Sequence, residues 1–79
     1  MARVLLFGRL ADQAGWRERD IPADSLASLT HILTLEDPAL GEALVCEGVQ
    51  IALDQALVRG DHALRPETEV AYLPPMSGG

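Results

Sequence analysis

The sequence contains no lysine, and its six basic residues are all arginine. Because lysine side chains are missing, the N-terminal amine is the only primary amine of the chain that could attack an activated carboxyl group. Twelve acidic residues against these six give a formal net charge of −6. Phosphate binding requires clustered Lys and Arg, so this charge argues against a nucleic-acid partner. It favours electropositive protein partners or, as the simpler alternative, a solvated acidic surface.

Cysteine is equally scarce, because Cys46 is the only one. A single cysteine excludes an internal disulfide framework and fits a reducing compartment. Its neighbours Val45 and Glu47 supply no activating base or cation, so we expect a structural thiol and not a nucleophile. With His31 and His62 as the only histidines, the chain shows no metal-ligand spacing, and we expect no metal.

Long hydrophobic runs and catalytic motifs are also missing. No apolar run approaches the roughly 20 residues that a transmembrane helix needs. Residues 1–7 begin like a signal peptide, but the apolar stretch is broken at Gly8 and Arg9 and no small-residue cleavage site follows. We therefore expect a cytoplasmic protein without a membrane partner. The chain has no Gly-rich phosphate loop and no nucleophile–base signature, so its body has no evident catalytic site.

The first half of the chain contains signals for two strands and a helix. Residues 3–7, "RVLLF", are apolar on successive positions after Arg3, which is typical of a strand buried on both faces or at the centre of a small sheet. Residues 8–15 are bracketed by glycines and have room for one helical turn before a half-exposed strand over residues 16–21. A cap at Asp24 or Ser25 and an apolar stripe then predict the main helix. The stripe consists of Leu26, Leu29, Ile32 and Leu33, with His31 between stripe positions.

The second half contains a short helix and three strands. Asp37 as N-cap and Pro38 at the first helical position predict a helix that ends near Leu44. Alternating apolar residues and turn signals then predict three strands. These strands are expected over residues 49–53, 56–58 and 69–73.

The order of these elements predicts an α+β domain with its helices on one face of a single sheet. The first and last strands both look central, and placing them side by side makes them parallel, with hairpins paired antiparallel outside them. That arrangement is the β-grasp of ubiquitin, here a mixed sheet of about five strands with one main helix and a short second one. We assign residues 1–74 to the β-grasp domain and residues 75–79 to a flexible C-terminal tail.

In the C-terminal stretch "PPMSGG" the stiff residues come first and the residues with the barest backbone come last, which is unusual. Pro74 and Pro75 favour extended polyproline geometry, which holds the tail off the body, while Gly78 and Gly79 have no side chains to clash with the walls of a channel. The four residues beyond Pro75 reach roughly 13 Å, enough to enter an active-site cleft. The α-carboxylate of Gly79 is ionised at neutral pH and unreactive toward nucleophiles. An enzyme would have to activate it with ATP as an acyl-adenylate before a sulfur nucleophile could react.

The end "EVAYLPPMSGG" resembles the C-terminal signature of the small subunits of molybdopterin synthase. The stretches "VLLFGRLADQAG", "ALDQALV" and "DHAL" line up with the same family, so the resemblance covers nearly the whole chain. It implies a ubiquitin-like sulfur carrier that is not catalytic alone and binds no cofactor stably. Gly79 would be adenylated by an E1-like enzyme that uses ATP, and would become a thiocarboxylate with the help of a sulfur-donor enzyme. Gly78 would provide clearance for the tail.

The resemblance also implies a partner and an acceptor. The tail would enter the large subunit of molybdopterin synthase, in a heterotetramer of two small and two large subunits. Two carriers in succession would each donate one sulfur to cyclic pyranopterin monophosphate and so build the dithiolene of molybdopterin. The expected partner contacts are Phe7, Tyr72, Leu73, Pro74, Pro75, Met76 and Ser77, although core packing is the stronger interpretation for the first two.

Three positions depart from the usual pattern of that family. Asp54 stands where relatives often have Asn, and "ETEV" over residues 67–70 stands where they often have "GDEV". We expect both differences to alter turns. Leu73 replaces a common Phe in the strand that leads to the expected docking surface, so it bears on the fit of the partner.

Three other functions remain open at the level of sequence. The same carrier chemistry could serve the thiamine thiazole, a tRNA base or a cysteine precursor, with a different partner. Gly79 could instead form an isopeptide bond to another protein, as in ubiquitin-like modifiers, although the lack of lysine forbids branched chains of the protein itself. Finally, the tail could be an idle, frayed end of an interaction domain.

Overall fold

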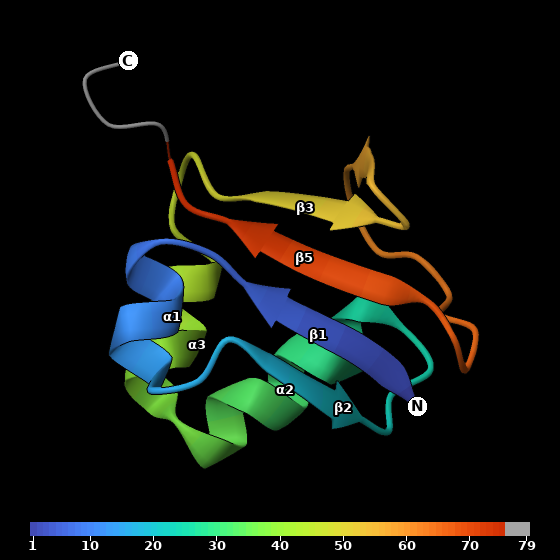
Figure 1. The fold of residues 1–79 in the computed structure, drawn as a ribbon, viewed down its shortest axis with the longest axis horizontal. Coiled ribbons are helices and arrows are strands. Elements are labelled where there is room, and N and C mark those ends of the chain that lie inside the picture. The colour runs from blue at the N-terminus through green and yellow to red at the C-terminus, as the bar shows by residue number, and fades with distance from the viewer. Residues whose placement is uncertain (76–79) are drawn as a thin grey trace.

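A computed structural model describes residues 1–75, which form one mixed sheet with three helices across one of its faces (Figure 1). The strands follow the order β2-β1-β5-β3-β4. They are β1 (Ala2–Leu6), β2 (Glu18–Ile21), β3 (Gln50–Leu53), β4 (Ala56–Val58) and β5 (Glu69–Leu73). The helices are α1 (Arg9–Ala14), α2 (Leu26–Glu36) and α3 (Pro38–Leu44). The predicted α+β, β-grasp fold is confirmed.

The first and last strands are parallel neighbours, as the sequence predicts. Leu6 of β1 lies opposite Tyr72 of β5, and β2 and β3 pair antiparallel with β1 and β5 on the outer sides. Strand β5, and not β1, occupies the middle of the sheet, because β3 and β4 both lie beyond it. In Figure 1 these two strands run side by side through the centre of the molecule.

Strand β1 shows how the two faces of the sheet differ. Val4 and Leu6 are buried beneath the helices, whereas Leu5 is only half-buried on the opposite face and Arg3 is exposed. Burial on both faces, one of the two interpretations of the apolar run, therefore does not apply. The run belongs to an interior strand of a sheet with one covered face, and the face without helices is called the open face below.

The helices begin where their caps predict. The hydroxyl of Ser25 accepts a hydrogen bond from the backbone N–H of Ser28 at 3.1 Å and caps α2. The carboxylate of Asp37 accepts from the backbone N–H of Leu40 at 3.2 Å and caps α3. Of the predicted stripe of α2 three leucines are buried and Ile32 is half-buried, while His31 is exposed. Satisfying the first N–H groups of a helix with a side-chain oxygen stabilises it by about 1 kcal/mol.

Two leucines of α2 provide a matched test of this packing. Leu29 is 0% exposed and Leu35 is 71% exposed on the same helix. We expect Leu29→Ala to lower the free energy of unfolding by about 2–5 kcal/mol, because it leaves a cavity in the core. Leu35→Ala should change it by less than about 0.5 kcal/mol. Urea unfolding of both variants measures the difference, and equal losses would contradict the packing of α2.

Candidate functional site

The candidate site is the end of β5, where the sheet leads into the C-terminal segment. Pro74 and Pro75 follow the strand directly and are both half-buried. The glycines expected to carry the chemistry, Gly78 and Gly79, lie outside the described residues. So do the expected partner contacts Met76 and Ser77.

Tyr72 anchors the end of β5 in the core. Its side chain is 0% exposed, and its hydroxyl forms a hydrogen bond of 3.1 Å with Oγ1 of Thr30 on α2. Burial raises the pKa of the Tyr72 phenol, and the hydrogen bond with Thr30 opposes that rise. Core packing, the alternative to a partner contact for this residue, is what the structure shows, because the side chain points toward the helices and leaves no surface free.

The open face has a charged end, far from the C-terminal segment. Arg3 lies in register between Asp20 of β2 and Glu69 of β5. It also forms an ion pair with Glu18, in which both side chains are well exposed. Exposed pairs of this kind contribute about 0–1 kcal/mol, so this end of the face keeps the sheet edge polar and adds little stability.

The other end of the open face is apolar and adjoins the end of β5. Strand registers align Leu5 with Ala71, Ala71 with Ala52, and Ala52 with Leu57. Alternation places Phe7 and Leu73 on the same face. Large side chains stay accessible there, since Phe7 is 44% and Leu57 61% exposed. We call this surface the apolar patch; it consists of Leu5, Phe7, Ala52, Leu57, Ala71 and Leu73.

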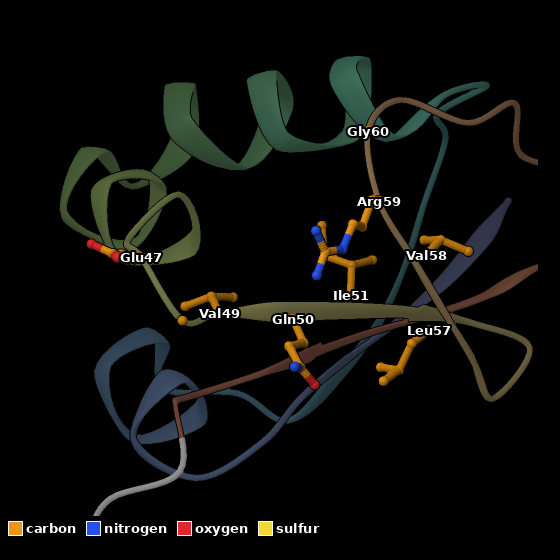
Figure 2. A pocket seen from close by; sticks show the side chains of 9 residues that line it. Glu47, Val49, Gln50, Ile51, Leu57, Val58, Arg59 and Gly60 are labelled. Carbon is orange, nitrogen blue, oxygen red and sulfur yellow. The ribbon is translucent and has the colours of Figure 1, made fainter. Parts of the chain in front are cut away.

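Figure 2 shows the edge of this surface from the side. The side chains of Gln50 and Leu57 lie on one side of β3 and β4, and those of Ile51 and Val58 on the other, toward the helices. Exposed apolar surface bordered by charges is typical of protein interaction sites. Of the expected contacts, Phe7 and Leu73 belong to the apolar patch, whereas sequence reasoning missed Leu57 and Leu5. The alternation in "ALV" was a signal for Leu57, but only strand register reveals which face it occupies.

The turn between β3 and β4 holds Leu57 in place. Asp54 and Gln55 both have positive φ, 48° and 73°, as in the tight turns that match the twist of a hairpin. The Asp54 carboxylate also accepts a hydrogen bond of 3.0 Å from the backbone N–H of Glu69. Aspartate tolerates the left-handed conformation as asparagine does, so the departure from the family pattern at this position preserves the turn.

A groove of about 750 Å³ lies along β3 and β4, lined by residues 47–51 and 57–60 (Figure 2). It holds no cluster of catalytic groups. Cys46 nearby is exposed, and its thiol donates to the carbonyl of Glu42 at 3.3 Å. Within residues 1–75, no three His, Cys, Asp or Glu side chains are placed to hold a metal ion. No helix in the same part of the chain is long and apolar enough to cross a membrane.

A β-grasp domain with an apolar patch beside a C-terminal Pro-Pro segment and a Gly-Gly end defines a ubiquitin-like protein. The model of the ThiS family matches residues 4–79. The chain belongs to this family of ubiquitin-like sulfur carriers and modifiers. Membership implies an activating partner of the E1-like class.

Similarity to individual proteins extends over the full length of the chain. It is 30% identical over 81 residues to the molybdopterin synthase sulfur carrier subunit of Escherichia coli (strain K12), with 100% of both chains covered. The solution structure of small archaeal modifier protein 1 from Methanosarcina acetivorans has a TM-score of 0.88 at 24% identity and covers 99% of this chain and 95% of its own. The crystal structure of its Haloferax volcanii counterpart has a TM-score of 0.80 at 24% identity, with 99% and 98% covered. Both structures support the fold.

The burial of Tyr72 predicts how stability changes at alkaline pH. Because its pKa is raised in the folded state, the folded chain retains the phenolic proton that the unfolded chain loses near pH 10. The contribution of Tyr72 to the free energy of unfolding should therefore be constant below about pH 10 and fall as pH rises further. The chain has one tyrosine and no lysine, so few other groups titrate in this range.

Urea unfolding between neutral pH and alkaline pH tests this prediction. Tyr72→Phe should remove most of the alkaline loss, at the cost of the hydrogen bond to Thr30. Cys46→Ser serves as the control, because it changes an exposed side chain outside the buried core. An alkaline loss that persists in Tyr72→Phe but disappears in Cys46→Ser would contradict the assignment.

Proposed function

We propose that this chain is the sulfur-carrying small subunit of a molybdopterin synthase. The observation that carries the proposal is the full-length similarity, at 30% identity, to the molybdopterin synthase sulfur carrier subunit of E. coli. A Pro-Pro segment and a Gly-Gly end directly after the last core strand support it, because they provide a narrow, unbranched chain end next to a folded body.

The chemistry takes place at the C-terminal carboxylate of Gly79. A carboxylate oxygen attacks the α-phosphorus of ATP on the E1-like enzyme, and pyrophosphate leaves. The resulting acyl-adenylate is a mixed anhydride, so a sulfur nucleophile at the oxidation level of sulfide, provided by a donor enzyme, can displace AMP and leave a thiocarboxylate. In the synthase the sulfur of this group forms a bond to a carbon of cyclic pyranopterin monophosphate and displaces an oxygen from it. Water then cleaves the carbon–sulfur bond to the carrier and restores the Gly79 carboxylate, and a second carrier donates the second sulfur of the dithiolene. Gly78 gives the clearance that this passage requires.

The folded body presents the tail to its partners. We assign the apolar patch, including Phe7 and Leu73, to docking on the large subunit, with Pro74 and Pro75 at its border. Met76 and Ser77 are proposed to line the entrance to the partner's active site. The net charge of −6 favours an electropositive ring around an apolar docking area. The proposed assembly is a heterotetramer of two carriers and two large subunits.

Reconstitution tests this function directly. Thiocarboxylated protein is mixed with a molybdopterin synthase large subunit and cyclic pyranopterin monophosphate, and we expect molybdopterin to form while the carrier returns to its carboxylate form. Intact mass spectrometry follows the replacement of one oxygen by one sulfur. Absence of turnover with a cognate large subunit would overturn the proposal. Sulfur transfer to a thiazole, tRNA or cysteine precursor instead would assign another pathway, and a covalent adduct with a protein lysine would indicate a modifier.

The reactive chain end is tested by changing its length. Deleting Gly79, or adding one residue after it, should abolish sulfur transfer while the melting temperature stays within the range typical of surface changes. Differential scanning calorimetry provides the stability control. Full sulfur transfer by the deletion variant would indicate that the tail is idle, and a large loss of stability would show that it belongs to the core.

The apolar patch predicts a matched pair of docking variants. Leu57→Asp places a charge in the patch, and Leu35→Asp places the same charge on an equally accessible leucine of α2, since the two are 61% and 71% exposed. We expect Leu57→Asp to weaken binding of the large subunit by about tenfold or more, because a charge is desolvated in the interface, and Leu35→Asp to have little effect. Titration calorimetry measures both, and equal affinities would remove the patch from the interface.

A further inference from the structure

The register of the sheet brings a glycine against each proline of the C-terminal segment. Leu6 lies opposite Tyr72 in the parallel pair, so Gly8, two residues further, comes beside Pro74. In the antiparallel pair Gln50 lies opposite Leu73, so Gly48, two residues earlier, comes beside Pro75. Figure 1 shows the corresponding loops, before α1 and before β3, on the two sides of the end of β5.

A side chain on either glycine would press against a proline, which would have to give by a few tenths of an ångström. A Cβ atom on Gly8 would lie 3.0 Å from Cγ of Pro74. A Cβ atom on Gly48 would lie 3.0 Å from Cβ and 3.1 Å from Cγ of Pro75. Both distances are shorter than ordinary van der Waals contact, so the proline ring or the loop would have to move.

We propose that Gly8 and Gly48 are positioning residues that form a two-sided seat for Pro74 and Pro75. This seat sets the direction in which the C-terminal segment leaves the sheet. The inference rests on the proposed function, in which that segment is the reagent. Gly8 and Gly48 act through the two prolines and take no part in the chemistry.

The prolines make the seat effective because they are stiff. Each ring fixes its own φ near −65°, and a proline restricts the residue before it to extended conformations. Leu73, Pro74 and Pro75 therefore have few torsions left to absorb a displacement. The hydrogen bond of 3.3 Å from the N–H of Phe7 to the carbonyl of Tyr72 holds the loop of Gly8 at this point. Lateral contact from both sides then restricts the remaining torsions.

Two other glycines of the chain provide controls. All four residues have positive φ, namely +56° at Gly8, +93° at Gly48, +84° at Gly15 and +75° at Gly60. Alanine is strained at positive φ at each of them. The values of ψ differ, at −134° for Gly8 and 11° for Gly15. At Gly15 and Gly60, however, a Cβ atom would meet nothing within 4 Å. Alanine at these positions strains the backbone without touching a proline.

The test measures adenylation of the full chain by a cognate E1-like enzyme, with the carrier as the varied substrate. We expect Gly8→Ala and Gly48→Ala to lower kcat by about tenfold, since the prolines must shift by a few tenths of an ångström and misplacing a reacting group by about 1 Å can cost about 100-fold. Their KM should stay within about twofold, because the surface of the folded body outside the C-terminal segment is unchanged. Gly15→Ala and Gly60→Ala should retain the kcat of the natural chain even where strain lowers their stability to the same extent, as urea unfolding will show.

A rescue variant separates contact from strain at Gly8. Pro74→Ala removes Cγ and Cδ, the atoms that a Cβ on Gly8 would meet at 3.0 and 3.8 Å. The loss caused by Gly8→Ala should therefore be smaller in the Pro74→Ala background than in the natural chain, a coupling that a double-mutant cycle measures. Additive losses would overturn the seat, and so would equal kcat values for Gly48→Ala and Gly60→Ala.

Nuclear Overhauser effects test the contacts of the seat without any enzyme. The α protons of Gly8 and Gly48 should show contacts with the rings of Pro74 and Pro75 respectively, in the natural chain and in Gly60→Ala. Their absence from the natural chain would overturn the seat whatever the activity. Failure of the natural chain to be adenylated, with these contacts present, would instead overturn the proposed function and leave the seat supported as a structural feature.

Discussion

The parallel pairing of β1 with β5 is the constraint on which the rest of the molecule depends. It joins the first strand to the last, so that Val4 lies opposite Val70 and Leu6 opposite Tyr72. Antiparallel neighbours can be joined by a short turn, but parallel strands need a long connection. Here this connection contains the three helices and the strands β2, β3 and β4. Because the two strands end at the same edge, the chain turns into α1 beside the point where the C-terminal segment begins.

Neighbouring residues of β5 point to opposite faces of the sheet and therefore have different roles. Tyr72 points toward the helices and is fixed by burial and by its hydrogen bond with Thr30. Leu73, the next residue, belongs to the open face and extends the apolar patch. A single strand therefore anchors the C-terminal segment in the core and also contributes to the surface beside it. The charged residues of the open face lie around Arg3, at one end, and its apolar residues lie at the other end, near the end of β5.

Local signals account for the parts of the fold that sequence reasoning placed correctly. Ser25 and Asp37 accept hydrogen bonds at helix starts, and Pro38 is compatible with the first helical turn. The starts of α2 and α3 could therefore be located from residues adjacent in the sequence. The β-grasp followed from the order of elements and two apolar terminal strands. For Tyr72 the sequence favoured core packing over a partner contact, since an aromatic residue suits both, and the register of β5 under α2 places it in the core.

By itself, the sequence determined the composition of the chain end, the lack of lysine, the caps and the apolar alternation, because these are properties of adjacent residues. Tertiary structure alone decided that Leu57 joins Leu5 on one face, and that Gly8 and Gly48 lie against Pro74 and Pro75. These residues are far apart in the chain and carry no common motif. Their proximity is set by strand register, a collective property of the whole sheet, in which a shift of one residue would exchange its two faces.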